Sequence, residues 1–158
     1  MRELILLRHA HAEPASTGQA DLDRPLSATG LAEAEAAGKW LKENNLRPDC
    51  VLCSPARRTR ETLEAVLAAT GVVEHRLEDG IYDATPGKLT ELVDERRDIE
   101  RLLVVGHNPG LEQLVAFMTE GSTSEYRGMP PAGIAVLQFD REAAIEPGVA
   151  KLTAFWWP

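Results

Sequence analysis

The segment that decides the fold is Leu4-Ile5-Leu6-Leu7-Arg8-His9-Ala10-His11, where four apolar residues are followed at once by charged and polar ones. A short apolar run that ends this abruptly is typical of a buried strand leading into a site. In open α/β sheets, ligands bind beyond the carboxyl ends of the strands. We therefore expect Arg8 and His9 to lie within reach of a ligand, although this pair alone is equally compatible with a basic surface loop.

A second apolar run, Val51–Cys53, is followed by Ser54 and Pro55. Ser54 can cap a helix and Pro55 suits its first position, which predicts a helix from Pro55 to about Thr70. Cations in the first turns of a helix oppose its dipole, and a bound anion would relieve that conflict. The segment therefore predicts a phosphate or oxyanion site. We expect one of three arginines to bind the anion and the other two to lie on the solvent-exposed face of the helix. These arginines are Arg57, Arg58 and Arg60.

A third apolar run, Leu102–Val105, is followed by Gly106 and His107, and Pro109 is suited to begin another helix. A single histidine at a strand end is more often structural than catalytic. Two histidines at the ends of separate strands, with arginines after a third strand, favour catalysis instead.

The rest of the chain alternates predicted helices with predicted strands. Ser27 can cap a helix that extends to about Asn44, and Thr85-Pro86 can begin another. The runs 134–139 and 149–156 are expected to be closing strands, one of them antiparallel at an edge. This alternation predicts an α/β fold with three α/β/α layers and a mainly parallel sheet. The inward face of the first helix is expected to contain Leu31, Ala34, Gly38 and Leu41.

Composition limits the classes of protein that the chain can represent. With 158 residues and no linker or repeat, residues 1–158 are expected to form one domain. The formal charge of -8 disfavours broad nucleic-acid binding, and no apolar run is long enough for a membrane span or signal peptide, so we expect a cytoplasmic protein. Cys50 and Cys53 lie three apart on a predicted strand and are expected to be packing residues and not a disulfide or zinc site.

Together, these segments resemble the histidine phosphatase superfamily, also called the phosphoglycerate mutase-like fold. The matching motifs are the tripeptide Arg8-His9-Ala10, the pattern Ser54-Pro55-x-x-Arg58-x-x-x-Thr62 and a second histidine after an apolar strand, His107. The register of the middle motif selects Arg58. The chain length and the segment Asp23–Gly30 are most similar to the SixA-type phosphohistidine phosphatases.

The resemblance implies a mechanism in which neutral His9 attacks phosphorus, forms a phosphohistidine and is released by water. Arg8, Arg58 and a protonated His107 would meet the charge of the transferring phosphoryl group. No metal or cofactor is implied. The proton donor is expected to be Asp83, with Glu78 as the fallback.

The same resemblance suggests the substrate, which we expect to be phosphohistidine on a protein, with small phosphoesters as the alternative. Arg24 is a candidate to touch the phosphate or the substrate. Tyr126, Arg127 and Met129–Pro131 are expected at the pocket rim. The sequence leaves the oligomeric state and the role of His11 open.

Two functions of other classes remain as alternatives. A metal-dependent hydrolase would use imidazole and carboxylate ligands, but this chemistry gives Arg8 and Arg58 no task. A phosphate-binding module without turnover would need the arginines but not the two histidines at strand ends. The ligands of the first alternative would be His9, His11, His107 and Asp83.

Overall fold

The computed structural model describes residues 1–121 and 128–158. Within them, six strands form one sheet in the order β3-β2-β4-β1-β5-β6. The strands β1 to β4 run parallel to one another, while β5 is antiparallel to both β1 and β6. The strand bounds are β1 Arg2–Arg8, β2 Cys50–Cys53, β3 Glu74–Leu77, β4 Arg101–Gly106, β5 Ile134–Phe139 and β6 Lys151–Trp156.

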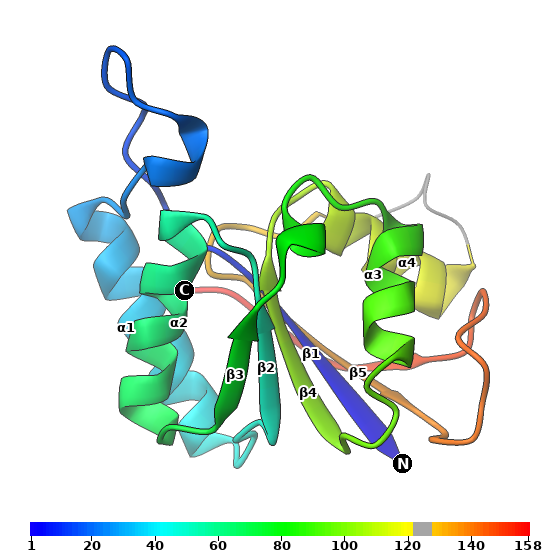
Figure 1. Ribbon diagram of the computed structural model, residues 1–158. Helices are drawn as coiled ribbons and strands as arrows, with labels where there is room; N and C mark the ends of the chain where they lie inside the picture. Colours follow the sequence, from blue (N-terminus) through cyan, green and yellow to red (C-terminus); the bar gives the residue numbers. More distant parts are fainter. Residues whose placement is uncertain (122–127) are drawn as a thin grey trace.

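In the same two described ranges, four helices cover the two faces of this sheet, with α1 and α2 on one face and α3 and α4 on the other (Figure 1). This is the three-layer, mainly parallel α/β fold that the sequence predicts. Two short 3-10 helices, η1 and η2, lie in loops at the carboxyl edge of the sheet. The bounds are α1 Ala28–Glu43, α2 Arg57–Thr70, α3 Pro86–Asp94, α4 Gly110–Glu120, η1 Asp21–Asp23 and η2 Asp79–Ile81.

The strand order brings three sequence segments to the same edge of the sheet. Arg8 at the end of β1 pairs with Gly106 at the end of β4, and Cys53 at the end of β2 pairs with Val105. The residues that follow these strands are therefore level with one another. His9 N–H donates to the Gly106 carbonyl oxygen at 3.1 Å, which fixes the first of these segments.

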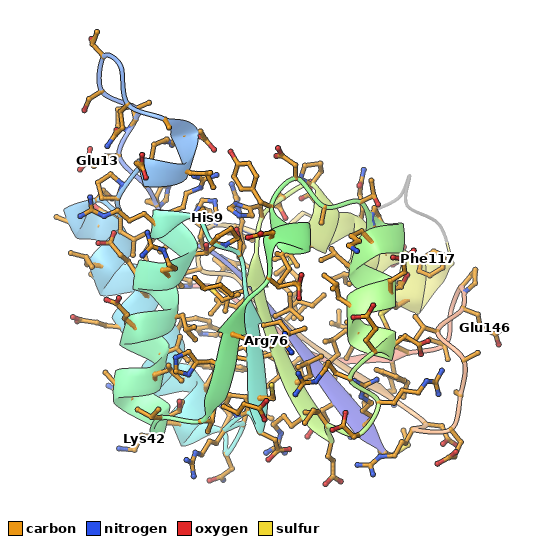
Figure 2. The ribbon with its side chains drawn as sticks, in the orientation of Figure 1. His9, Glu13, Lys42, Arg76, Phe117 and Glu146 are labelled. Carbon is orange, nitrogen blue, oxygen red and sulfur yellow. The ribbon has the colours of Figure 1, made fainter. Side chains whose placement is uncertain are left out.

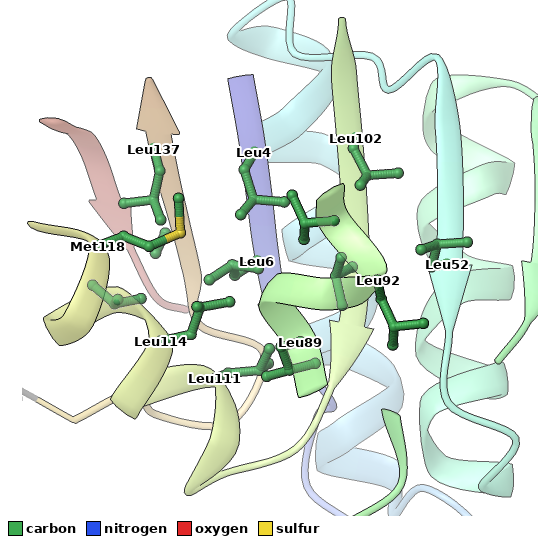
Figure 3. Close-up of a cluster of buried hydrophobic side chains, with 14 of the residues drawn as sticks. Leu4, Leu6, Leu52, Leu89, Leu92, Leu102, Leu111, Leu114, Met118 and Leu137 are labelled. Carbon is green, nitrogen blue, oxygen red and sulfur yellow. The ribbon is translucent and has the colours of Figure 1, made fainter. Parts of the chain in front are cut away.

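The apolar core has two halves, one on each side of the sheet. Leu4 and Leu6 point toward α3 and α4, whereas Ile5 and Leu7 point toward α1 and α2, as the two-residue period of a strand requires (Figure 3). Each of these four side chains is buried, and burial of such a side chain contributes about 1.5–3 kcal/mol. The apolar run before Arg8 is thus the central support for the edge of the sheet that carries the polar segments.

Three local predictions are wrong. Ala56, not Ser54, is the N-cap of α2, because the Ser54 hydroxyl accepts hydrogen bonds from the Ala56 N–H and from His107. Leu31 is 48% exposed. The cause is Gly30, which faces inward so closely that an added Cβ would lie 2.0 Å from the His11 carbonyl oxygen, and this turns Leu31 outward.

The third wrong prediction concerns a helix start, because Pro109 is the N-cap and α4 begins one residue later, at Gly110. The prediction of an antiparallel closing strand at an edge is confirmed. The strand β6 is at the edge of the sheet and pairs antiparallel with β5, which lies between β1 and β6.

Cys50 and Cys53 are both buried and free, as expected for packing residues. Across residues 1–121 and 128–158, we find no helix with the length and apolar character needed to cross a membrane. The division of the chain into one domain stays a prediction.

Candidate active site

The structure brings Arg8, His9, Arg58 and His107 together at the carboxyl edge of the sheet. Figure 2 shows His9 at this edge. The ring centroids of His9 and His107 are 5.3 Å apart, with an angle of 57° between the ring planes. Arg58 Nη2 lies 3.4 Å from His107 Nδ1. Two imidazoles and a guanidinium from three strand ends therefore surround one small space.

His9 is held with one ring nitrogen occupied and the other available. Its Nδ1–H donates to the carbonyl oxygen of Ala10 at 2.7 Å, which places the lone pair of the neutral ring on Nε2. Burial lowers the pKa of His9 to about 4, and the neighbouring positive charges of Arg58 and Arg8 add to this effect. At neutral pH this side chain is therefore an uncharged imidazole with a free lone pair.

His107 is oriented by contacts at both ring nitrogens. Its Nε2–H donates to Ser54 Oγ at 2.7 Å, and its Nδ1 faces the Arg58 guanidinium. Burial, followed by the proximity of His9, lowers the pKa of His107 to about 3. The protonated His107 of the expected mechanism is therefore not the state of the ligand-free protein, in which this ring is neutral.

Arg58 is the arginine of α2 that faces the site, and its side chain is 8% exposed. Its guanidinium donates to Asp21 twice, from Nη1 to the carbonyl oxygen at 2.8 Å and from Nη2 to Oδ2 at 3.0 Å. By contrast, Arg57 and Arg60 are exposed. Arg57 Nε donates to Glu61 Oε2 at 3.4 Å, and Arg60 Nε donates to the Pro55 carbonyl oxygen at 3.0 Å. Only one of the three arginines thus lies at the site, as the sequence motif indicates.

Arg8 approaches the same space from β1 and is anchored by Met129. Arg8 Nη1 and Asn108 Nδ2 both donate to the Met129 carbonyl oxygen, at 2.8 Å and 2.9 Å. Arg8 Nε and Asn108 Oδ1 are buried and have no hydrogen-bond partner among the described residues. Unpaired buried polar atoms are rare, and functional sites are one of the places where they occur.

Asp83 and His107 both line a pocket of about 260 Å³. Its backbone is in the left-handed region, with a φ of 56°. Glu78, the fallback proton donor, precedes η2 and is not one of the described residues that line this pocket. The pocket is lined by Asp83, Ala84, Thr85, His107, Asn108, Pro109, Gly110 and Gln113.

The other candidate residues have mixed positions. Arg24 lies near the site but is engaged within its own loop, where Nη1 donates to Asp21 Oδ1 at 3.0 Å and Nε donates to the Glu13 carbonyl oxygen at 2.9 Å. His11 is exposed and pairs with Glu33 at 2.8 Å. Of the expected pocket rim, Tyr126 and Arg127 lie outside the described residues.

The ligand set of the metal-dependent alternative is not gathered. His11 contacts Glu33 and does not join His9 and His107. Across the two described ranges, no group of three His, Cys, Asp or Glu side chains is placed so that it could hold a metal ion.

Sequence patterns miss or misassign three residues of the site and do not predict the contacts of a fourth, Thr62. Asp21 and Tyr82 gave no signal, because each sits in a loop and contacts the site across a long sequence separation. The sequence pattern predicts a helix cap at Ser54, whereas its hydroxyl binds His107. Thr62 belongs to the middle motif, and its hydroxyl joins the site segments by donating to the Arg58 carbonyl oxygen at 2.8 Å and accepting from the Ala10 N–H at 3.1 Å.

Comparisons with known proteins agree with this geometry. The family model of the histidine phosphatase superfamily (branch 1) matches residues 4–98. An uncharacterized protein of Mycobacterium tuberculosis is 38% identical over 162 residues, which cover 96% of this chain and 99% of the relative.

Solved structures give the same result for the fold. A structure from Agrobacterium tumefaciens, provisionally assigned as the phosphohistidine phosphatase SixA, superposes with a TM-score of 0.86 at 30% identity, covering 99% of this chain and 98% of the other. A mycobacterial glucosyl-3-phosphoglycerate phosphatase superposes with a TM-score of 0.72 at 20% identity, covering 98% of each chain. At that identity the second likeness concerns the fold alone.

Proposed function

Since this chain belongs to the histidine phosphatase superfamily (branch 1) and is a phosphatase of that superfamily, we propose that it dephosphorylates phosphohistidine on proteins through a covalent intermediate at His9. The observation that carries the proposal is the placement of His9, with its Nε2 lone pair free, 5.3 Å from the ring of His107 and close to Arg58. Neither a phosphate-binding module nor a simple basic loop requires a neutral imidazole among fixed cations.

The proposed reaction has two displacements. In the first, the His9 Nε2 lone pair forms a bond to phosphorus as the bond to the leaving nitrogen or oxygen breaks, and the leaving group takes that electron pair and a proton. In the second, a water oxygen attacks phosphorus, the bond to His9 breaks with its electron pair returning to Nε2, and the water proton passes to the carboxylate that acted as acid in the first step. Inorganic phosphate leaves, and His9 is again neutral. We assign no metal or cofactor to either step.

The side chains around His9 have distinct tasks in this proposal. Arg8 and Arg58 stabilise the negative charge on the phosphoryl oxygens. This stabilisation matters most in the transition state, where the bonds to phosphorus are loose. His107 is neutral in the free protein, and a bound phosphoryl dianion favours its protonation. Asp83 gives the proton to the leaving group from its place at the pocket beside His107.

The shape of the site supports a protein substrate. The pocket beside His107, about 260 Å³, is smaller than the roughly 300–1,000 Å³ typical of pockets that enclose small ligands. It shares Gln113 with a groove of about 320 Å³ between α3 and α4, where Phe117 and Pro86 also lie. A substrate side chain presented by another protein does not need to be enclosed, so a pocket of this size is compatible with a protein substrate. The cytoplasmic location expected from the sequence stays a prediction.

A substrate panel tests the proposal. Phosphohistidine on a carrier domain, phosphoserine and small sugar phosphates are compared at equal concentration by release of inorganic phosphate. We expect the highest kcat/KM for phosphohistidine on protein. Efficient turnover of a sugar phosphate together with inert phosphohistidine domains would assign the enzyme to small phosphoesters, and binding without phosphate release would leave only a binding module.

A further inference from the structure

A residue other than Arg8, His9, Arg58 and His107 makes several of the hydrogen bonds around the site, and this residue is Asp21. Asp21 lies in η1, on the loop of residues 12–27 that projects from the carboxyl edge of the sheet, the loop on which Figure 2 marks Glu13. The Asp21 side chain accepts from Arg58 Nη2 at 3.0 Å, from the Tyr82 hydroxyl at 2.5 Å and from Arg24 Nη1 at 3.0 Å. Its carbonyl oxygen accepts a fourth bond, from Arg58 Nη1 at 2.8 Å.

These contacts determine how the Arg58 guanidinium is turned. A guanidinium has five N–H groups in one plane. Asp21 accepts two of them, and His107 Nδ1 faces a third at 3.4 Å. Three contacts therefore fix the orientation of the group, which leaves two of its five N–H groups available to phosphoryl oxygens within the part of the chain that the structure describes.

The same carboxylate also holds the ring that packs on His107. The Tyr82 ring meets the His107 ring edge to face, with 5.5 Å between the centroids, and its hydroxyl is bound to Asp21 Oδ2. Asp21 thus controls two neighbours of His107, the Arg58 guanidinium at Nδ1 and the aromatic ring of Tyr82.

On the premise of the proposed function, we propose that Asp21 is a positioning residue, which orients Arg58 and Tyr82 so that the guanidinium and His107 meet the phosphoryl group in the transition state. The competing interpretation is that its carboxylate is only a stand-in for phosphate on the same donors. The contact between Arg58 Nη1 and the Asp21 carbonyl oxygen argues against that interpretation, because a main-chain oxygen is not an anion that phosphate would replace.

Exposure separates this role from a structural one. The Asp21 side chain is 47% exposed, and ion pairs at such sites contribute little to stability. Loss of the carboxylate should therefore leave the folded protein intact while freeing a guanidinium whose direction matters for catalysis. Misplacement of a catalytic group by about 1 Å can cost on the order of 100-fold in rate.

The first test compares Asp21→Asn with Asp23→Asn, which removes the same charge two residues along the same loop. We expect Asp21→Asn to lower kcat roughly 10- to 100-fold, with a smaller change in KM and an unchanged melting temperature, and Asp23→Asn to stay near wild type. On an Arg58→Ala background, Asp21→Asn should have a several-fold smaller effect, because only the positioning of Tyr82 is then still lost. An unchanged kcat, or equal effects on both backgrounds, would overturn the proposal.

The second test does not depend on turnover. Orthovanadate, which resembles the phosphoryl group in transit, is titrated into wild type and Asp21→Asn by calorimetry. We expect weaker binding to Asp21→Asn even though a negative charge has been removed. Tighter binding would show that Asp21 is a phosphate stand-in and overturn its positioning role. A wild-type protein that binds vanadate but hydrolyses no member of the substrate panel would contradict the proposed function alone.

Discussion

His9 and His107 face each other at the ends of β1 and β4 with 5.3 Å between their ring centroids, and burial keeps both rings uncharged near neutral pH. Two adjacent imidazoles would repel each other if both were protonated, and Arg8 and Arg58 add further positive charge. The arrangement therefore selects a neutral His9, the form that can act as a nucleophile. It also leaves a neutral His107 that can take up a proton when an anion arrives.

This pairing has a consequence for stability. Histidines in an unfolded chain titrate near 6.5, whereas the pKa is about 4 for His9 and about 3 for His107 in the folded protein. Between about pH 4 and 6.5 the unfolded chain binds more protons, so the free energy of unfolding falls as the pH is lowered. The expected slope is at most about 1.4 kcal/mol per pH unit for each histidine.

Urea unfolding measured from pH 7 to pH 4 checks this slope. The His9→Gln, His107→Gln double variant should lose most of it. Asp21 does not affect this comparison. Hydrogen bonds from Tyr82 and Arg24 and the contact with Arg58 hold the pKa of its carboxyl well below the usual range. Its contribution to the free energy of unfolding is therefore lost only at lower pH. A slope that is unchanged in the double variant would show that other groups cause the acid sensitivity.

Arg58 provides a matched pair with its neighbour. Arg58→Ala should lower kcat by about 100- to 1,000-fold, because charge on the phosphoryl oxygens is left unmet in the transition state. Arg57→Ala removes the same charge from a side chain that is 48% exposed and pairs with Glu61, and it should change kcat little. Steady-state rates and melting temperatures of the two variants test this difference. Equal losses of kcat in both variants would indicate a general effect of removing a positive charge.

The proton donor is tested by changing the leaving group. An imidazole leaves more easily than an alkoxide, so Asp83→Asn should slow hydrolysis of phosphoserine by about 100-fold or more while phosphohistidine loses less than about tenfold. Asp79→Asn serves as the control, because it removes a carboxylate from the neighbouring η2. If Glu78→Gln shows this leaving-group dependence and Asp83→Asn does not, Glu78 is the acid.

The metal-dependent alternative has its own test. We expect initial rates to survive dialysis against EDTA and not to rise when Zn²⁺ is added, because the proposed steps use an imidazole nucleophile and arginine cations. Loss of activity on dialysis that zinc restores would favour metal-assisted hydrolysis instead.

Much of the fold and the centre of the site could be predicted because both depend on local patterns. The apolar run Leu4–Leu7 followed by Arg8 and His9 indicates a strand that ends at a site, and the parallel order of the strands then places His107 and Arg58 nearby. Ser54 shows the limit of such patterns. Its position before a proline is typical of a helix cap, but its hydroxyl is taken by His107, a partner that is distant in sequence.

Asp21 and Tyr82 could not have been predicted for a related reason. Their partnership joins the loop after β1 to η2, and no periodicity, cap or motif marks it. Helical spacing predicts Leu31 in the core, but the close approach of Gly30 to the His11 carbonyl oxygen fixes the rotation of α1. Contacts of this kind depend on tertiary packing, which single-sequence patterns do not contain.

The covalent intermediate is the central claim and has one direct measurement. The protein is mixed with its best substrate, quenched within milliseconds in alkali, which preserves phosphohistidine, and analysed by peptide mass spectrometry. We expect one phosphoryl group on His9 during turnover, and neither this species nor turnover in His9→Ala. Full activity of His9→Ala, or a phosphoryl group on a different residue, would contradict the account.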